Sequence, residues 1–136
     1  MRIPASELLR LHEHAVEGYP HEVCGILAGD RPTGLVQRVQ PLVNERSDSP
    51  RNRYRVSGLT LMRAEQALEA QGHEIVGYYH SHPDHPADYS ETDRDNALPN
   101  MSYLITAVHE GRIADTKVWR LREDRSAMEQ ESLEQE

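Results

Sequence analysis

Residues 75–83, which read Ile-Val-Gly-Tyr-Tyr-His-Ser-His-Pro, restrict the possible folds more than any other segment. The β-branched and aromatic residues predict a strand. Pro83 cannot continue a central strand, because proline has no backbone N–H. On an extended backbone, residues two apart point to the same side, so His80 and His82 are expected to converge on one point. The segment therefore predicts a strand that ends in a pair of imidazoles.

Asp93 follows the histidines after a polar loop, and a short helix beginning near Ser90 could return its carboxylate to them. Two histidines and one carboxylate leave one position open on a tetrahedral zinc ion, which is typical of a catalytic rather than a structural site. Residues 90–93 also fit a helix capping box, in which Ser90 and Asp93 serve only to begin a helix. Without the histidine pair, the capping interpretation would be preferred.

Length, charge and cysteine content exclude several functional classes. A chain of 136 residues is the size of one domain with one core. Its formal net charge of −8 disfavours nucleic acid as a partner, because an acidic surface repels phosphates. Cys24 is the only cysteine, which excludes an intrachain disulfide and favours a cytoplasmic location. No segment approaches the roughly 20 apolar residues of a membrane helix, so no membrane association is expected.

Hydrophobic periodicity predicts a mixed α/β fold. Apolar residues at helical spacing indicate a helix over residues 6–18, with Ser6 as its N-cap, and another from Ser57 to Gly72. Strands are expected within residues 21–29, 34–43, 53–56, 75–82, 101–108 and 112–121. Together with the short helix near Ser90, these elements predict a single sheet flanked by two longer helices and one short helix.

The domain is expected to span residues 1–121. From Arg122 onward the composition becomes acidic and polar, which predicts a flexible tail over residues 122–136. The arginine cluster Arg51/Arg53/Arg55, with Arg46 nearby, could contact an acidic partner. The favoured interpretation is a charged edge strand that resists aggregation.

Glu22 begins the first expected strand, and on its own it would be interpreted as a surface carboxylate. Its value as a general base depends on the metal cluster downstream. Cys24 lies on the same strand face, but a lone cysteine in an apolar strand is typically a small buried hydrophobic residue. His12 and His14 diverge by about 200° on a helix, so they are not expected to bind a metal.

Three other metal-enzyme patterns fail. Residues 80–85 fit H-x-H-x-D-H, the motif of metallo-β-lactamase-like hydrolases, but that fold needs further ligands far downstream, and only His109 remains after His85. An amidohydrolase-type barrel requires a much longer chain. The H-E-x-x-H signature is absent, because residue 25 is glycine and not histidine.

The pattern that remains is Glu22, then His80-Ser81-His82-Pro83, six residues, Ser90, two residues and Asp93. It resembles the signature of the JAMM (MPN-plus) metalloprotease family, an upstream Glu followed by H-S/T-H-P-x(6)-S-x-x-D, and every position matches. The resemblance runs roughly from Ile3 to Leu121 and implies a JAMM/MPN-like fold.

The resemblance also implies roles. Zinc would be held by His80, His82 and Asp93 with water in the fourth position, Glu22 would act as general base, and Ser90 would stabilise the oxyanion. The implied reaction is hydrolysis after the C-terminal Gly-Gly of a ubiquitin-like protein. The short chain is similar to compact bacterial members that process ubiquitin-like sulfur-carrier proteins, releasing cysteine or another adduct. The alternative is a non-hydrolytic zinc-containing module that docks a ubiquitin-like protein, which would not need Glu22 as a base.

Overall fold

The structure is a computed structural model, and it describes residues 1–43 and 57–136. The helices are α1 (Ala5–Gly18), α2 (Gly58–Ala70) and α3 (Glu91–Asn96), and the strands are β1 (Arg2–Ile3), β2 (Cys24–Asp30), β3 (Leu35–Leu42), β4 (Glu74–Pro83), β5 (Ser102–His109), β6 (Arg112–Leu121), β7 (Met128–Glu131) and β8 (Glu134–Gln135). The predicted mixed α/β class, with two longer helices and one short one, is confirmed. The strand and arginine cluster expected between residues 46 and 56 lie outside the described residues.

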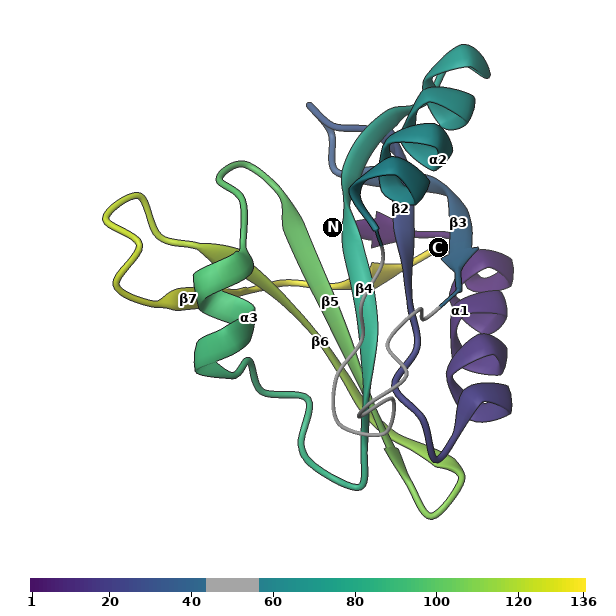
Figure 1. The fold of residues 1–136 in the computed structure, drawn as a ribbon, viewed down its shortest axis with the longest axis vertical. Coiled ribbons are helices and arrows are strands. Elements are labelled where there is room, and N and C mark those ends of the chain that lie inside the picture. Colours follow the sequence, from purple (N-terminus) through teal and green to yellow (C-terminus); the bar gives the residue numbers. More distant parts are fainter. Residues whose placement is uncertain (44–56) are drawn as a thin grey trace.

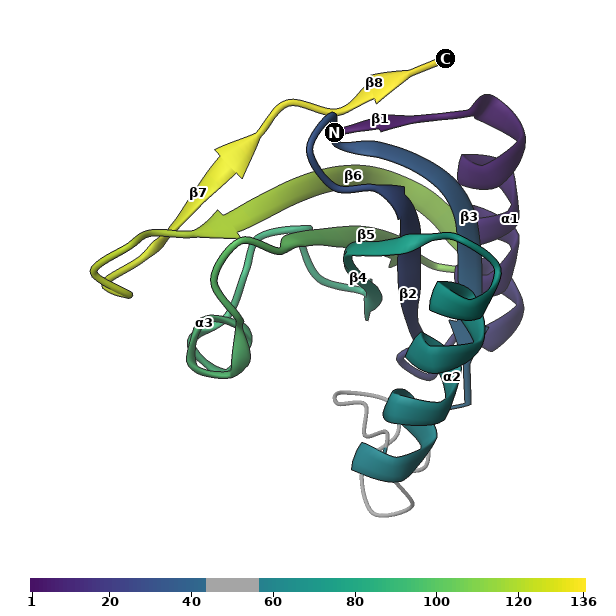
Figure 2. The ribbon, with the colours of Figure 1, turned by 90° about the horizontal axis from the view of Figure 1, so that it is seen from above.

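The eight strands form one curled sheet in the order β7-β6-β5-β4-β2-β3-β1-β8 (Figure 2). The central strand β4 is antiparallel to β2 and parallel to β5. In this register Cys24 lies opposite His80, and Pro83 is the last paired residue of β4. The sheet therefore places the end of the histidine strand between β2 and β5.

Helices α1 and α2 cover opposite faces of the sheet (Figure 1). Leu8, Leu11 and Ala15 of α1 are buried in the main core against the strands. Leu68 of α2 packs with Ile26 and other residues on the opposite face. Each leucine buried in this way contributes about 1.5–3 kcal/mol, which holds both helices against the sheet. Among the described residues, no helix is both long enough and apolar enough to cross a membrane.

The predicted N-cap residue is correct for α2 but not for α1. Ser57 caps α2, since its hydroxyl accepts the N–H of Thr60 at 3.2 Å. The prediction that Ser6 caps α1 is wrong, because α1 begins at Ala5 with Pro4 as the N-cap residue. The N–H of Ala5 donates instead to the carbonyl of Glu136, at 2.7 Å. A backbone group distant in sequence thus takes the place of the expected cap.

The C-terminal segment is ordered, which corrects the expectation of a flexible tail over residues 122–136. Strand β7 pairs with β6, and β8 pairs with β1. Because β7 and β8 are also the two outermost strands of the sheet, one short stretch of chain connects its two edges (Figure 2). We call residues 128–135 the closing segment.

Polar backbone pairing and one buried side chain hold the closing segment in place. The N–H of Glu134 donates to the carbonyl of Met1 at 2.9 Å. Met128 is buried, while Glu131 forms ion pairs with the Met1 ammonium at 2.8 Å and with Arg120 at 3.2 Å. The acidic composition that predicted disorder is accommodated because its carboxylates face solvent or cations.

Candidate metal centre

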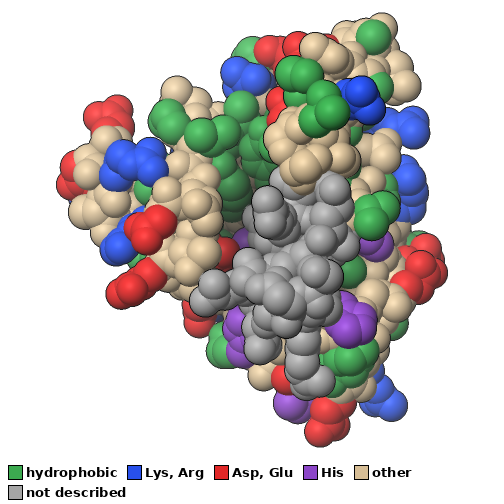
Figure 3. All heavy atoms as spheres, viewed as in Figure 1, with side chains coloured by type: hydrophobic (Ala, Val, Ile, Leu, Met, Phe, Trp, Pro, Cys, Tyr) green, Lys and Arg blue, Asp and Glu red, His purple; other side chains and the backbone are tan. Residues whose placement is uncertain are grey.

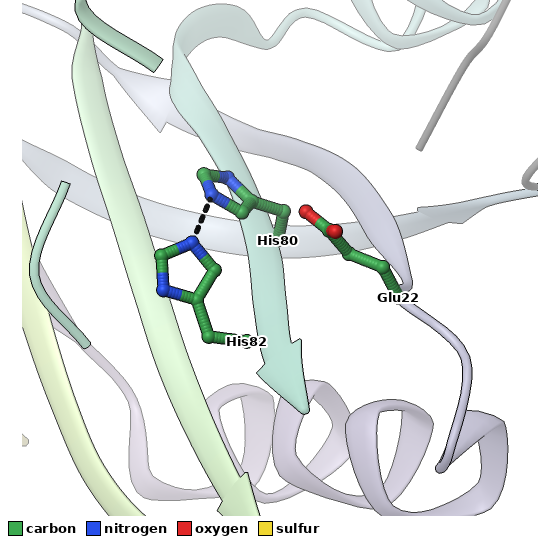
Figure 4. Close-up of side chains that lie close together, drawn as sticks. All are labelled: Glu22, His80 and His82. Carbon is green, nitrogen blue, oxygen red and sulfur yellow. Dashed lines mark hydrogen bonds between the residues drawn. The ribbon is translucent and has the colours of Figure 1, made fainter. Parts of the chain in front are cut away.

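The two histidines lie at the end of β4 and face the same side of the sheet (Figure 4). His80 and His82 are buried, with 2% and 3% of their surfaces exposed. Their Nε2 atoms are 3.2 Å apart. The convergence expected from their spacing is therefore present.

Asp93 reaches the histidines from α3. Its Oδ1 lies 3.2 Å from Nε2 of His80, and its Oδ2 lies 3.5 Å from Nε2 of His82. Oδ2 also accepts the N–H of Ser90 at 2.9 Å, while the Ser90 hydroxyl accepts the N–H of Asp93 at 3.0 Å. The capping interpretation and the metal-site interpretation are thus compatible, since the capping box fixes the carboxylate that faces the imidazoles.

Glu22 approaches from the segment just before β2, and its carboxylate is directed toward His80 (Figure 4). It is buried, and one ligand atom each of Glu22, His80 and His82 lie within 4.8 Å of one another. Two carboxylates therefore lie beside the imidazole pair. They come from segments that are far apart in sequence, Glu22 from just before β2 and Asp93 from α3.

Ser81, between the two histidines, holds the Glu22 segment in place. Its side chain is fully buried, and its hydroxyl accepts the N–H of Val23 at 2.9 Å. Its own N–H donates to the carbonyl of Val23 at 3.0 Å. Two hydrogen bonds thus fix the residue next to Glu22 against the strand that carries both imidazoles.

We expect Ser81→Ala to lower kcat about tenfold or more while the protein keeps its metal, because Val23, next to Glu22, loses the bond from its N–H to the Ser81 hydroxyl. Ser81→Thr keeps a hydroxyl and should restore most of kcat. Steady-state kinetics and metal analysis of both variants make the comparison. Equal losses of kcat in the alanine and threonine variants would contradict this role.

The protonation states of the site suit metal binding. The carbonyl of Pro86 can only accept, so the 2.7 Å contact places the proton of a neutral His82 on Nδ1 and leaves Nε2 as a donor atom for a metal. Burial lowers the pKa of His80 and so favours the neutral ring. Burial acts to raise the pKa of Asp93, but the hydrogen bond with His80 and the one from the backbone N–H of Ser90 hold this pKa well below its usual range. Neutral imidazoles and an ionised carboxylate are the forms that bind a metal.

The spacing of these groups also fits a tetrahedral ion. Ligand atoms about 2.0–2.1 Å from such an ion lie roughly 3.3–3.4 Å apart. The separations of 3.2 Å between the imidazoles and of 3.2 and 3.5 Å from them to Asp93 are close to this value. Glu22 is near enough to be a ligand as well, so distance alone does not decide which carboxylate binds the ion.

The other cysteine and histidine candidates lie outside the metal centre or at its edge. Cys24 is buried, as predicted for a small hydrophobic residue. His12 and His14 bond separately to Thr116 and to the hydroxyl of Tyr79, so they form no ligand pair. His85, to which the sequence assigned no role, has an exposed ring that stacks on His82 with centroids 4.1 Å apart. The sequence signal that could have indicated this contact is the position of His85 only three residues after His82.

A curled mixed sheet with a buried imidazole pair and two carboxylates at the end of its central strand defines a candidate metal-dependent hydrolase. Residues 4–122 match the family model described as prokaryotic homologs of the JAB domain, Prok-JAB. The chain therefore belongs to this family, and its resemblance to the JAMM metalloproteases is confirmed.

Named relatives support a hydrolytic class. The chain is 39% identical over 97 residues to a desampylase from Haloferax volcanii, covering 68% of this chain and 69% of the relative. It is 36% identical over 103 residues, 76% of this chain and 67% of the relative, to a probable TtuB-protein conjugate cleaving protease from Thermus thermophilus. It is 29% identical over 110 residues, 79% of this chain and 73% of the relative, to a CysO-cysteine peptidase from Mycobacterium tuberculosis.

Solved structures agree with the fold. A protein from Desulfitobacterium hafniense superimposes with a TM-score of 0.84 at 26% identity, covering 99% of this chain and 92% of that one. A JAB1/MPN domain protein from Archaeoglobus fulgidus superimposes with a TM-score of 0.64 at 20% identity, covering 99% and 98%. The JAMM/MPN-like fold implied by the sequence is confirmed.

Proposed function

We propose that this chain is a zinc metallopeptidase that cleaves after the C-terminal Gly-Gly of a ubiquitin-like sulfur-carrier protein and releases cysteine or another adduct. The observation that carries the proposal is the buried imidazole pair, 3.2 Å apart, with Asp93 and Glu22 close by. The relatives named as a desampylase, a conjugate cleaving protease and a CysO-cysteine peptidase support the substrate class. The solitary Cys24 is the basis for proposing a cytoplasmic enzyme.

The arrangement of the site supports a separate role for each of its residues. His80, His82 and Asp93 would hold zinc, which when bound supplies Lewis acidity that polarises the scissile carbonyl and acidifies water. Glu22 would take a proton from the attacking water and deliver it to the leaving amine as the C–N bond breaks. Burial beside the imidazoles places this carboxylate where bulk water competes weakly for the proton.

Ser90 would donate a hydrogen bond from its hydroxyl to the carbonyl oxygen of the scissile bond as negative charge develops there. The 3.0 Å bond from the N–H of Asp93 occupies the Ser90 oxygen only as an acceptor, so its proton remains available for donation. The same bond holds the hydroxyl oxygen in place. A pre-positioned donor of this kind typically contributes about 3–4 kcal/mol to transition-state stabilisation.

A mass-spectrometric cleavage assay tests the proposal. The substrate is a sulfur-carrier protein that ends in Gly-Gly followed by a short C-terminal extension, incubated with the zinc-loaded protein. We expect a single cut directly after Gly-Gly that a chelator stops and added zinc restores. Carrier and zinc binding without any cleavage would instead support the non-hydrolytic docking module, and a cut elsewhere would exclude the proposed specificity.

A further inference from the structure

Helix α3 carries Asp93 but has little to hold it in place by itself. It has six residues, and none of these described residues is buried. A helix this short is unstable in water without tertiary contacts. The capping box orders its first turn, but the position of the helix relative to β4 must come from the segments on either side.

On the N-terminal side, the segment that leads into α3 rests on β6. The indole N–H of Trp119 donates to the carbonyl of Ala87 at 3.0 Å. Tyr89 meets the same indole edge to face, with ring centroids 5.0 Å apart. Ala87 itself is buried. This side anchors the loop that precedes the capping residue Ser90.

On the C-terminal side, α3 contacts the loop of residues 122–127, which we call the β6–β7 loop (Figure 1). The Arg125 guanidinium donates from Nη2 to the carbonyls of Asp95 at 3.5 Å and Ala97 at 3.2 Å. Ala97 is buried in a cluster with Leu121 and Met128, on the strands that flank the loop. A cation at this end also complements the helix dipole.

A second contact runs in the opposite direction, from the helix to the loop. The guanidinium of Arg94 donates to the carbonyl of Ser126 at 3.4 Å. Basic and acidic side chains gather together on this edge of the molecule (Figure 3). The loop and the last turn of α3 are therefore joined by reciprocal side-chain to backbone bonds, next in sequence to the residue that faces His80 and His82.

We infer that the β6–β7 loop sets the metal affinity of the site by holding α3 against the sheet, with Arg125 as a positioning residue for Asp93. The inference rests on the proposed role of Asp93 as a ligand. Residues 123–127 of this loop lie beyond the part of the chain that the family model matches. A segment that the sequence suggested was a tail thus completes the metal centre.

The test is a competition titration of Zn²⁺ against a chromophoric chelator, using the full-length chain. Arg125→Ala should bind Zn²⁺ about tenfold more weakly than the unmodified protein, the lower end of the effect of removing an outer-sphere support. The urea midpoint of the metal-free protein should change little, because Arg125 is exposed. Arg125→Lys keeps the charge but loses Nη2, the nitrogen that donates both bonds, so its Zn²⁺ affinity should be intermediate. This variant is used if the alanine variant does not fold.

Arg122→Ala is the matched control. Arg122 is in the same loop but pairs with Asp124 and Glu129, so its removal should leave Zn²⁺ affinity unchanged. Asp93→Ala tests the role of Asp93 as a ligand separately from the role of Arg125 as a positioning residue. If this variant binds Zn²⁺ as tightly as the unmodified protein, the ligand assignment fails. If it binds weakly while the Arg125 variants match the unmodified protein, the positioning inference alone is overturned.

Discussion

Glu22→Gln is expected to reduce cleavage of the carrier conjugate by about 10²–10⁴-fold, because general acid–base catalysis of this kind contributes that much. The amide is almost the same size as the carboxylate but cannot accept the proton of the attacking water. Bound zinc and affinity for the carrier should stay close to those of the unmodified protein. Single-turnover rates, metal analysis and carrier binding would be measured on the same preparation.

The control for this variant is Glu13→Gln, which removes the same charge from an exposed position on α1 and should leave the rate unchanged. Glu22 is close enough to the imidazoles to be a ligand itself. Loss of zinc from Glu22→Gln would therefore exchange the roles proposed for Glu22 and Asp93. Loss of folding would mean that the buried carboxylate is needed for structure.

Ending the chain after Leu121 is expected to destabilise the domain by several kcal/mol, a large part of the typical total of about 5–15 kcal/mol. The truncation removes β7 and β8 and leaves both edges of the sheet without partners. It also loses the burial of Met128, worth about 2 kcal/mol, and the partly buried ion pair of Glu131 with the Met1 ammonium. Urea unfolding followed by circular dichroism measures the change.

A shorter truncation, after Leu133, separates the contributions of the two strands. It removes β8 but keeps β7, so we expect a smaller loss of stability. A chain ending at Leu121 that unfolds at the same urea concentration as the full chain would show that residues 122–136 contribute nothing to stability. That result would restore the original interpretation of a flexible tail.

The parts of the structure that could be predicted are those with a local signature. The period of two in β4 was sufficient to bring His80 and His82 together, and the spacing from Ser90 to Asp93 indicated a capped helix. The sequence signature also included Glu22, although the sequence does not give the distance in space between Glu22 and the histidines. Side-chain type and spacing carried this information.

The parts that were missed depend on backbone groups of distant residues. Ser6 looked like a cap, but the carbonyl of Glu136 satisfies the start of α1. Residues 128–131 read Met-Glu-Gln-Glu and lack the apolar alternation of a strand, yet the exposed edge of β6 supplies their partners. The contacts of Arg125 with the carbonyls of α3 leave no trace in composition or periodicity.

Pairing of β1 with β8 has a consequence for synthesis of the protein. Strand β1 receives one of its two neighbours, β8, only after residues 134–135 have been made. Until then the nascent chain can contain every residue of the metal centre while the edge of β1 still lacks its second partner. Premature release would therefore produce a species with a nearly complete site but exposed strand edges, which are the surfaces that drive aggregation. Completion of the closing segment covers the edges of β6 and β1 with β7 and β8.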